Sequence, residues 1–166
     1  MKFIKGNPKQ AISVPDLPGN YIICLKPSST LCNNLVSYTE YEKLKVLYTG
    51  ISSKSLRKRD IKQHFYGHAG QSTLRKSIGS LMGLNKIPRD QSNPTNGKTK
   101  FTAIDEAKLT EWMLENLAFF YCVSNNPIQF ETSLIAKFNP PLNISKNYNS
   151  TNKSFRQDLK MLRRKV

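Results

Sequence analysis

Three short runs of apolar and β-branched residues along the chain predict strands. They cover residues 20–25, 45–51 and 118–123, and Pro, Gly or polar residues lie around them. Gly50, inside the second run, marks either a β-bulge or a position that another group must approach closely. These runs predict a small central β-sheet of about three strands.

Between and after these runs, the spacing of apolar residues changes to that of helices. Apolar positions three or four apart predict helices that begin at or near Ser55, Ser72, Asp105, Pro127 and Thr151. Residues 88–100 are rich in Asn, Pro, Gly, Ser and Thr and show no period, which indicates a surface loop. We therefore expect an α+β fold in which helices flank the sheet, with a helical insertion at about 66–117 and a basic C-terminal helix at about 151–166.

The length of 166 residues, 38% of them hydrophobic, predicts a single folded domain over residues 1–166 with its core at about 18–143. No apolar run approaches the roughly 20 residues of a membrane span. No apolar segment follows the charged start either, so we expect no membrane association and a cytoplasmic location. Cys24, Cys32 and Cys122 lack the spacing of a zinc site or a disulfide framework, so we expect reduced thiols.

The balance of charge points to a polyanionic partner. The chain has 26 Lys and Arg against 11 Asp and Glu, a formal net charge of +15. Clustered cations release counterions from a phosphate backbone, so nucleic acid is the expected partner. A solvated basic face and adsorption of the last helix to anionic lipid are the alternatives. The side chains expected to contact nucleic acid are Lys54, Lys58, Lys62, Arg75, Lys76, Arg89, Lys98 and Lys100.

One carboxylate lies on an apolar stripe. Glu131 shares a helical face with Leu134, Ile135 and Phe138, so its charge needs a partner. A bound cation would meet that need, and so would an ion pair with an Arg or the dipole of the helix.

Aromatic and basic side chains provide a second group of candidates. Tyr21 and Tyr48 lie on two predicted strands, where they either converge on one point or serve sheet packing. Arg57, Arg59 and His64 follow on the helix after the second strand. Fixed positive charge beside tyrosines and a carboxylate suits phosphodiester chemistry, because negative charge develops in its transition state. A solvated basic helix is the alternative.

Taken in order, these pieces resemble the GIY-YIG endonuclease superfamily, and in particular its small stand-alone, restriction-type members. The resemblance runs from about Pro18 to Asn143. It rests on Gly19-Asn20-Tyr21, Tyr48-Thr49-Gly50, the basic helix with His64-Phe65, Glu131, and Asn139-Pro140-Pro141-Leu142-Asn143. No single piece is specific, but five pieces in this order make chance similarity a poor explanation.

The resemblance implies a role for each motif residue. Glu131 would hold one Mg²⁺ or Mn²⁺ ion, and Tyr21, directly or through a water, would be the general base with Tyr48 in its network. His64 would orient the phosphate or exchange a proton with the base, and Asn143 would support the metal site or its helix.

The resemblance also requires a catalytic arginine, and two residues compete for that role. Arg57 shares a regular helical face with His64, whereas the motif anchored on Leu56 selects Arg59. We favour Arg59, which requires a bulge or an irregular helix start.

The expected activity is metal-dependent hydrolysis of DNA, as by a site-specific restriction-type enzyme on duplex DNA, with a homodimer as one way to cut both strands. The alternatives are a non-catalytic DNA-binding or architectural protein, and a GIY-YIG nuclease that acts on RNA or branched DNA.

Overall fold

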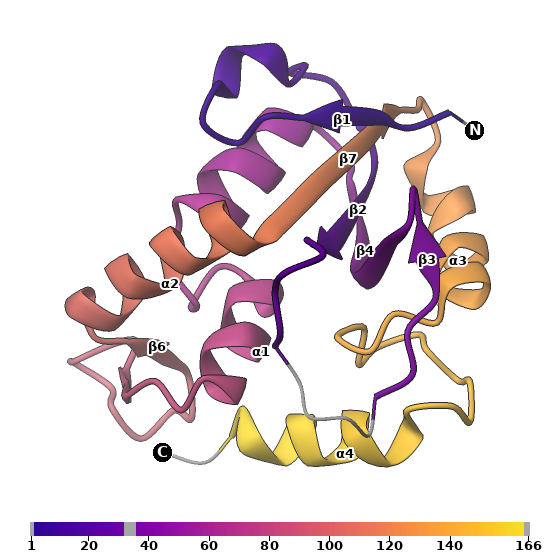
Figure 1. Cartoon of the computed structure of the whole chain (residues 1–166). Coiled ribbons are helices and arrows are strands. Elements are labelled where there is room, and N and C mark those ends of the chain that lie inside the picture. Colours follow the sequence, from indigo (N-terminus) through magenta and orange to yellow (C-terminus); the bar gives the residue numbers. More distant parts are fainter. Residues whose placement is uncertain (1, 32–35, 165–166) are drawn as a thin grey trace.

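The computed structural model describes residues 2–31 and 36–164; Cys32 and Lys165 lie outside the described residues. The fold is α+β, built on an antiparallel five-stranded sheet in the order β1-β7-β2-β4-β3 (Figure 1). The strands are β1 (Ile4–Gly6), β2 (Gly19–Leu25), β3 (Glu40–Tyr41), β4 (Leu44–Ser52) and β7 (Leu117–Val123). The three central strands β7, β2 and β4 are the predicted ones. The expected total of about three was too low, because β1 and β3 are two or three residues long and carry no alternating pattern.

Five helices begin close to the predicted positions: the π-helix η2 (Arg57–Phe65), α1 (Thr73–Leu81), α2 (Ala103–Asn116), α3 (Pro127–Phe138) and α4 (Lys153–Leu162). The 3₁₀ turn η1 (Ala11–Ser13) was not predicted. Pro127 begins α3, where its missing N–H costs no hydrogen bond, and the hydroxyl of Ser72 caps α1 by accepting from the amide of Arg75.

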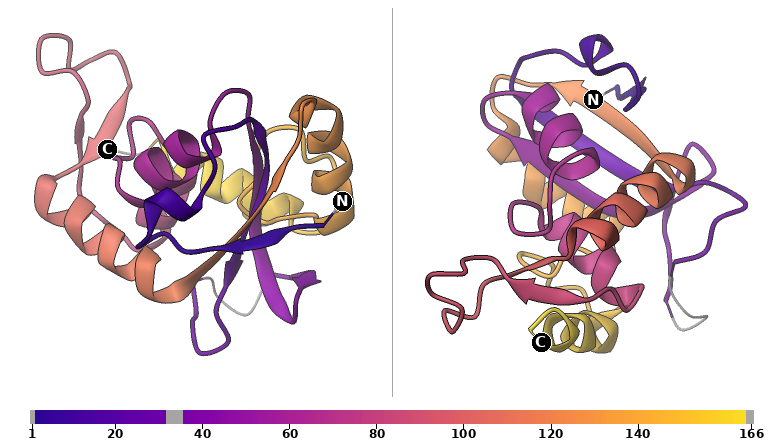
Figure 2. Two further views of the ribbon diagram at one scale, coloured as in Figure 1. Left: turned by 90° about the horizontal axis from the view of Figure 1, so that it is seen from above. Right: turned by 90° about the vertical axis from the view of Figure 1, so that its left-hand side faces the viewer.

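The predicted helical insertion with its surface loop also contains a short hairpin that was not predicted. Between α1 and α2 the chain forms a hairpin of β5 (Lys86–Pro88) and β6 (Thr99–Phe101), with the polar segment 89–98 as its loop. Each strand has three residues, too few for a period of two to stand out from the polar background. The hairpin projects beyond the body of the molecule in both views of Figure 2.

Helices pack on both faces of the central sheet, which explains why every residue of β2 is buried. Tyr21, Ile23 and Leu25 face the larger core, which includes side chains of η2, α1, α2 and α4. Ile22 and Cys24 face the smaller core against α3. Side chains alternate between faces along a strand, so consecutive residues of β2 enter different cores.

A register irregularity in the sheet places a second tyrosine beside the first. Ile23 pairs with Tyr48, but Cys24 pairs with Val46, so one residue of β4, Leu47, is extra at this point. As a result Leu47 and Tyr48 both pack on the face of the larger core. The ring centroids of Tyr21 and Tyr48 are 6.2 Å apart.

Gly50 lies directly opposite Tyr21 in the sheet. A Cβ atom at Gly50 would lie 2.3 Å from the phenolic oxygen of Tyr21, which no real contact tolerates. Of the two sequence-based interpretations of Gly50, the close approach of another group is the one that the structure confirms.

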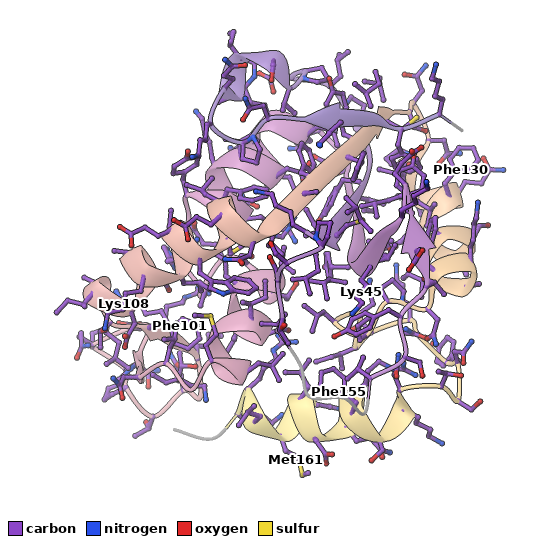
Figure 3. All side chains as sticks on the ribbon, viewed as in Figure 1. Lys45, Phe101, Lys108, Phe130, Phe155 and Met161 are labelled. Atoms are coloured by element: carbon purple, nitrogen blue, oxygen red, sulfur yellow. The ribbon has the colours of Figure 1, made fainter. Side chains whose placement is uncertain are left out.

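The last helix closes the lower side of the body in Figure 1. Phe155 lies on the side of α4 that faces the body, and Met161 points away from it (Figure 3). This arrangement agrees with the packing of Phe155 and Leu159 in the larger core and with the 57% exposure of Met161. Among the described residues, none of the helices has the length and apolar character needed to cross a bilayer.

We predict that Gly50→Ala destabilises the protein by about 1–3 kcal/mol, because the new methyl group must displace the buried ring of Tyr21. Thermal unfolding measures this cost. Gly70→Ala is the matched control, since its Cβ would meet side-chain atoms of Arg89 and His68 rather than a buried ring. Equal losses in the two variants would contradict the close approach at Gly50.

Candidate active site

A cleft of about 340 Å³ opens where β4, α1, α3 and α4 come together. One carboxylate and several cations line it. The lining residues are Tyr48 of β4, Thr73 and Lys76 of α1, Glu131 of α3, the segment 142–146, and Lys160, Arg163 and Arg164 at the end of α4. Tyr48 and Glu131, predicted from distant parts of the sequence, therefore face the same space.

Behind Tyr48 lies a buried hydrogen-bonded chain. The hydroxyl of Tyr21 is 2.7 Å from Nε2 of His64, and Nδ1 of His64 is 2.7 Å from Oγ of Ser72. Tyr21, His64 and Ser72 are each 1% exposed or less. Each nitrogen of the His64 ring therefore has a hydrogen-bond partner, and these two bonds fix the orientation of the imidazole relative to the Tyr21 phenol.

The electrostatics of this chain favour neutral groups. Burial, reinforced by the charges of Arg59 and Arg75, holds the pKa of His64 well below its usual value, so the imidazole is uncharged at neutral pH. Burial raises the pKa of Tyr21 well above its usual value, with Tyr48 and Asp60 adding to the shift and Arg59 opposing it.

One tautomer of His64 lets the imidazole accept the phenolic proton of Tyr21. The hydroxyl oxygen of Ser72 accepts from the amide of Arg75 at 3.1 Å and retains a second lone pair for an N–H at Nδ1. Nε2 is then free to accept the phenolic proton of Tyr21. In the other tautomer, Nε2 donates to the Tyr21 hydroxyl and Nδ1 accepts from the Ser72 hydroxyl.

The π-helix resolves where the two candidate arginines point. Its hydrogen bonds join residues five apart, as from the amide of Tyr66 to the carbonyl of Ile61, so residues five apart lie on neighbouring turns of one face. Arg59, five residues before His64, consequently lies close enough to Tyr21 for its positive charge to oppose the rise in the pKa of the phenol.

Arg57 points away from the cleft. Its Nε donates to the carbonyl of Val14 at 2.7 Å, so this guanidinium anchors the segment before β2. Arg59 also donates to Oε1 of Gln63 at 2.8 Å. The irregular helix expected with Arg59 is present, and it extends along all of η2 rather than only at the start.

Glu131 lines the cleft near the end of the apolar stripe and is already paired with a cation. The ammonium group of Lys146 donates to its Oε2 at 2.5 Å, and the Glu131 side chain is 16% exposed. Lys146 adopts a left-handed backbone conformation with φ of 61°, which is uncommon for lysine. The carboxylate of Glu131 thus has a positive partner, as its position on the apolar face of α3 indicated it would need.

The residues near Glu131 fit a magnesium or manganese ion held by few protein ligands. Among the described residues no cluster of three or more His, Cys, Asp or Glu could form a complete metal cage. Mg²⁺ in phosphoryl chemistry keeps several waters and is held by one or two carboxylates together with substrate phosphate oxygens. A single accessible carboxylate that already holds a cation matches that pattern.

Asn143 contributes to the site through the backbone. Its side-chain oxygen accepts from the amide of Thr49 at 2.9 Å and its side-chain nitrogen donates to the carbonyl of Thr49 at 2.8 Å. These two bonds fasten the segment after α3 to the strand between Tyr48 and Gly50. Asn143 therefore positions the two halves of the site relative to each other.

The cations predicted to contact nucleic acid divide into three groups. A second hollow adjoins the cleft, and Lys76, Arg89 and Lys98 line it; Lys76 lines the cleft as well. Lys54, Lys58, Lys62 and Lys100 line neither space. Arg75 was wrongly predicted as a surface contact: it is fully buried, pairs with Glu106 at 2.7 Å and donates to the carbonyls of His64 and Phe65. Its position on a basic stretch of sequence concealed its place on the inner face of α1.

Sequence patterns missed several residues of the site. Ser72 was identified as a helix cap, but its second contact with His64 depends on how η2 and α1 pack. Lys146 lies three residues after Asn143 in the segment that returns to the cleft, a position that could have drawn attention to it. The cations at the end of α4 were assigned to a basic helix without any indication that they line the cleft.

Asp60 of η2 is completely buried. Neither of its carboxylate oxygens has a hydrogen-bond partner among the described residues. Burial raises the pKa of Asp60 well above its usual value, and the charge of Arg59 opposes this shift. The folded protein therefore binds the Asp60 proton more tightly than the unfolded chain does.

This proton linkage predicts a pH-dependent effect of Asp60→Asn. Above the ordinary carboxyl pKa of about 3.9, the unfolded chain loses this proton first, so Asp60 makes stability fall as pH rises toward the raised folded value. The melting temperature of Asp60→Asn relative to the native chain should consequently increase from about pH 4 to pH 7. Asp16→Asn, at an exposed position, is the control. A difference in melting temperature between Asp60→Asn and the native chain that stays constant with pH would contradict the raised pKa of Asp60.

Comparison with known proteins identifies the family. The family model described as the GIY-YIG catalytic domain matches residues 19–165. No curated protein and no solved structure matches this chain. The matched region contains both strand tyrosines, His64, Glu131 and Asn143, so it confirms the resemblance drawn from the ordered motifs. The chain belongs to the GIY-YIG catalytic domain family.

Proposed function

We propose that this chain is a metal-dependent endonuclease that hydrolyses phosphodiester bonds of duplex DNA, in the manner of a site-specific restriction-type enzyme. The observation that carries the proposal is the meeting of Tyr21, His64 and Arg59 directly behind a cleft that contains Glu131. The cations around that cleft suit a polyanionic substrate. Membership of a family of nucleases supports the same reaction.

The buried chain supports removal of a proton from the attacking water. Tyr21 is 1% exposed, so it can meet a small reactant such as water rather than the substrate backbone itself. The phenolic proton of Tyr21 passes to Nε2 of His64, and the resulting phenolate takes a proton from the water as that water attacks phosphorus. Arg59 stabilises the negative charge that develops on the phenol, while the bond from phosphorus to the leaving oxygen breaks.

Glu131 is the residue that would hold the divalent cation, taking it in place of the Lys146 ammonium group. When bound, that ion would polarise the scissile phosphate and stabilise the leaving oxygen. Tyr48 lines the cleft and lies 3.3 Å from the hydroxyl of Thr73, measured between the two oxygens, so it is placed to orient the substrate phosphate. Cutting of both strands would be simplest for two copies acting on a symmetric site.

Glu131→Gln should reduce cleavage by at least about 100-fold while DNA binding persists, because the substitution removes the charge that holds the ion. The test is incubation with supercoiled plasmid and phage DNA in Mg²⁺, Mn²⁺ or EDTA, with a gel-shift assay and a Mn²⁺-binding titration in parallel. Glu111→Gln, at an exposed position of α2, is the control. Undiminished cleavage by Glu131→Gln would refute the metal role, and native protein that shifts DNA without cutting it would favour a binding module.

The two arginines of η2 should separate in the same assay. Arg59→Lys should lower the cleavage rate by about 100-fold or more. A lysine ammonium group cannot reproduce the planar guanidinium that Gln63 holds beside Tyr21. Arg57→Lys should retain the rate within a few-fold, since Arg57 bonds the Val14 carbonyl away from the cleft. Circular dichroism spectra of the two variants should match that of the native protein, which checks that both fold. The reverse order of rates would assign the role to Arg57.

A further inference from the structure

A second hollow of about 250 Å³ continues the cleft on the side away from Glu131. Thr73, Lys76 and Arg163 line both spaces, so they form the boundary between them. The far side of the second hollow is lined by Arg89 and Lys98, which flank the loop of the β5–β6 hairpin. The two spaces together form one path from Glu131 to the hairpin.

The hairpin and the end of α4 are tied together along this path. Nζ of Lys86, on β5, donates to the carbonyl of Leu162 at 2.8 Å, and Nη1 of Arg89 donates to the carbonyl of Gly70 at 2.9 Å. The described C-terminal end of α4 lies beside the hairpin in Figures 1 and 2. The walls of the second hollow are therefore held in place by hydrogen bonds between elements distant in sequence.

Like charges accumulate at the boundary between the two spaces. The pKa of Lys76 is lowered by burial and then by the charges of Arg163, Lys86 and Arg89. Among the residues that the structure describes, no Asp or Glu lines the second hollow. In the described part of the chain, the side-chain ion pairs within 4.0 Å are Arg75–Glu106 and Lys146–Glu131, and neither involves Lys76, Arg89 or Arg163.

Such a cluster costs folding free energy, because partly desolvated like charges repel each other. An anion placed between Lys76 and Arg163 would remove that cost. The planar donors of arginine match the oxygens of a phosphate group, and the hollow leads directly from the cleft where the scissile phosphate is proposed to lie.

We propose that Lys76 and Arg163 bind a second phosphate group of the substrate strand, next to the scissile one, and direct that strand between α4 and the hairpin toward Arg89. This assignment rests on the proposed function, because it takes the cleft as the site of cleavage. It assigns the C-terminal helix a direct part in substrate binding, and it gives the hairpin loop contact with the substrate beyond the site of cleavage.

The salt dependence of DNA binding tests the site without requiring cleavage. Binding of a short mixed-sequence duplex in EDTA should weaken as salt rises, so a plot of log association constant against log salt has a negative slope. Each lost phosphate contact should reduce the magnitude of that slope by about 0.9. Lys76→Gln and Arg163→Gln should each show this smaller slope. Lys153→Gln, which removes a positive charge from the first turn of the same helix, should keep the native slope.

Thermal unfolding separates this result from damage to the fold. Because Lys76 and Arg163 repel each other, Lys76→Gln and Arg163→Gln should melt at or above the native temperature in the absence of DNA. Native protein that binds and cuts DNA, together with an unchanged slope in both variants, would overturn the phosphate site alone. Native protein that neither binds nor cuts DNA would overturn both the proposed function and this site.

Discussion

The hydrogen bond between the Tyr21 hydroxyl and His64 is the contact that the rest of the site is arranged to permit. The phenol can occupy its position because Gly50, opposite it in the sheet, has no side chain. The extra residue in β4 keeps Tyr48 on the same face. Ser72 holds the other nitrogen of the imidazole while capping α1, so the start of that helix and the orientation of the ring are fixed together.

The electrostatic design of the cleft is asymmetric. One carboxylate, Glu131, lies among cations contributed by α1, α4 and the segment after α3. Behind it, His64 and Tyr21 are kept neutral by burial, so positive charge faces the opening and uncharged proton carriers lie inside. This separation suits a reaction in which a polyanion stays at the surface while protons move in the interior.

The three central strands and the α-helices that pack on them could be predicted from the sequence, because burial on one or both faces imposes a period on side chains. The motif residues could be predicted as well, and the family match confirms the resemblance that grouped them. What could not be predicted depended on three-dimensional packing. Whether Arg57 or Arg59 turns inward depends on the π-helix, and the local sequence around Asp60 contains no period that identifies one. The burial of Arg75 depends on α1 meeting Glu106 of α2, which no local pattern encodes.

The hairpin loop has an evolutionary consequence. Every residue from Arg89 to Lys98 is exposed, and short strands of three residues join this loop to the body. Changes of sequence or length there would leave the sheet, the two cores and the Tyr21–His64 contact undisturbed. Under the proposed function, the hairpin is the part of this molecule in which mutation can alter target preference without changing the residues behind the cleft.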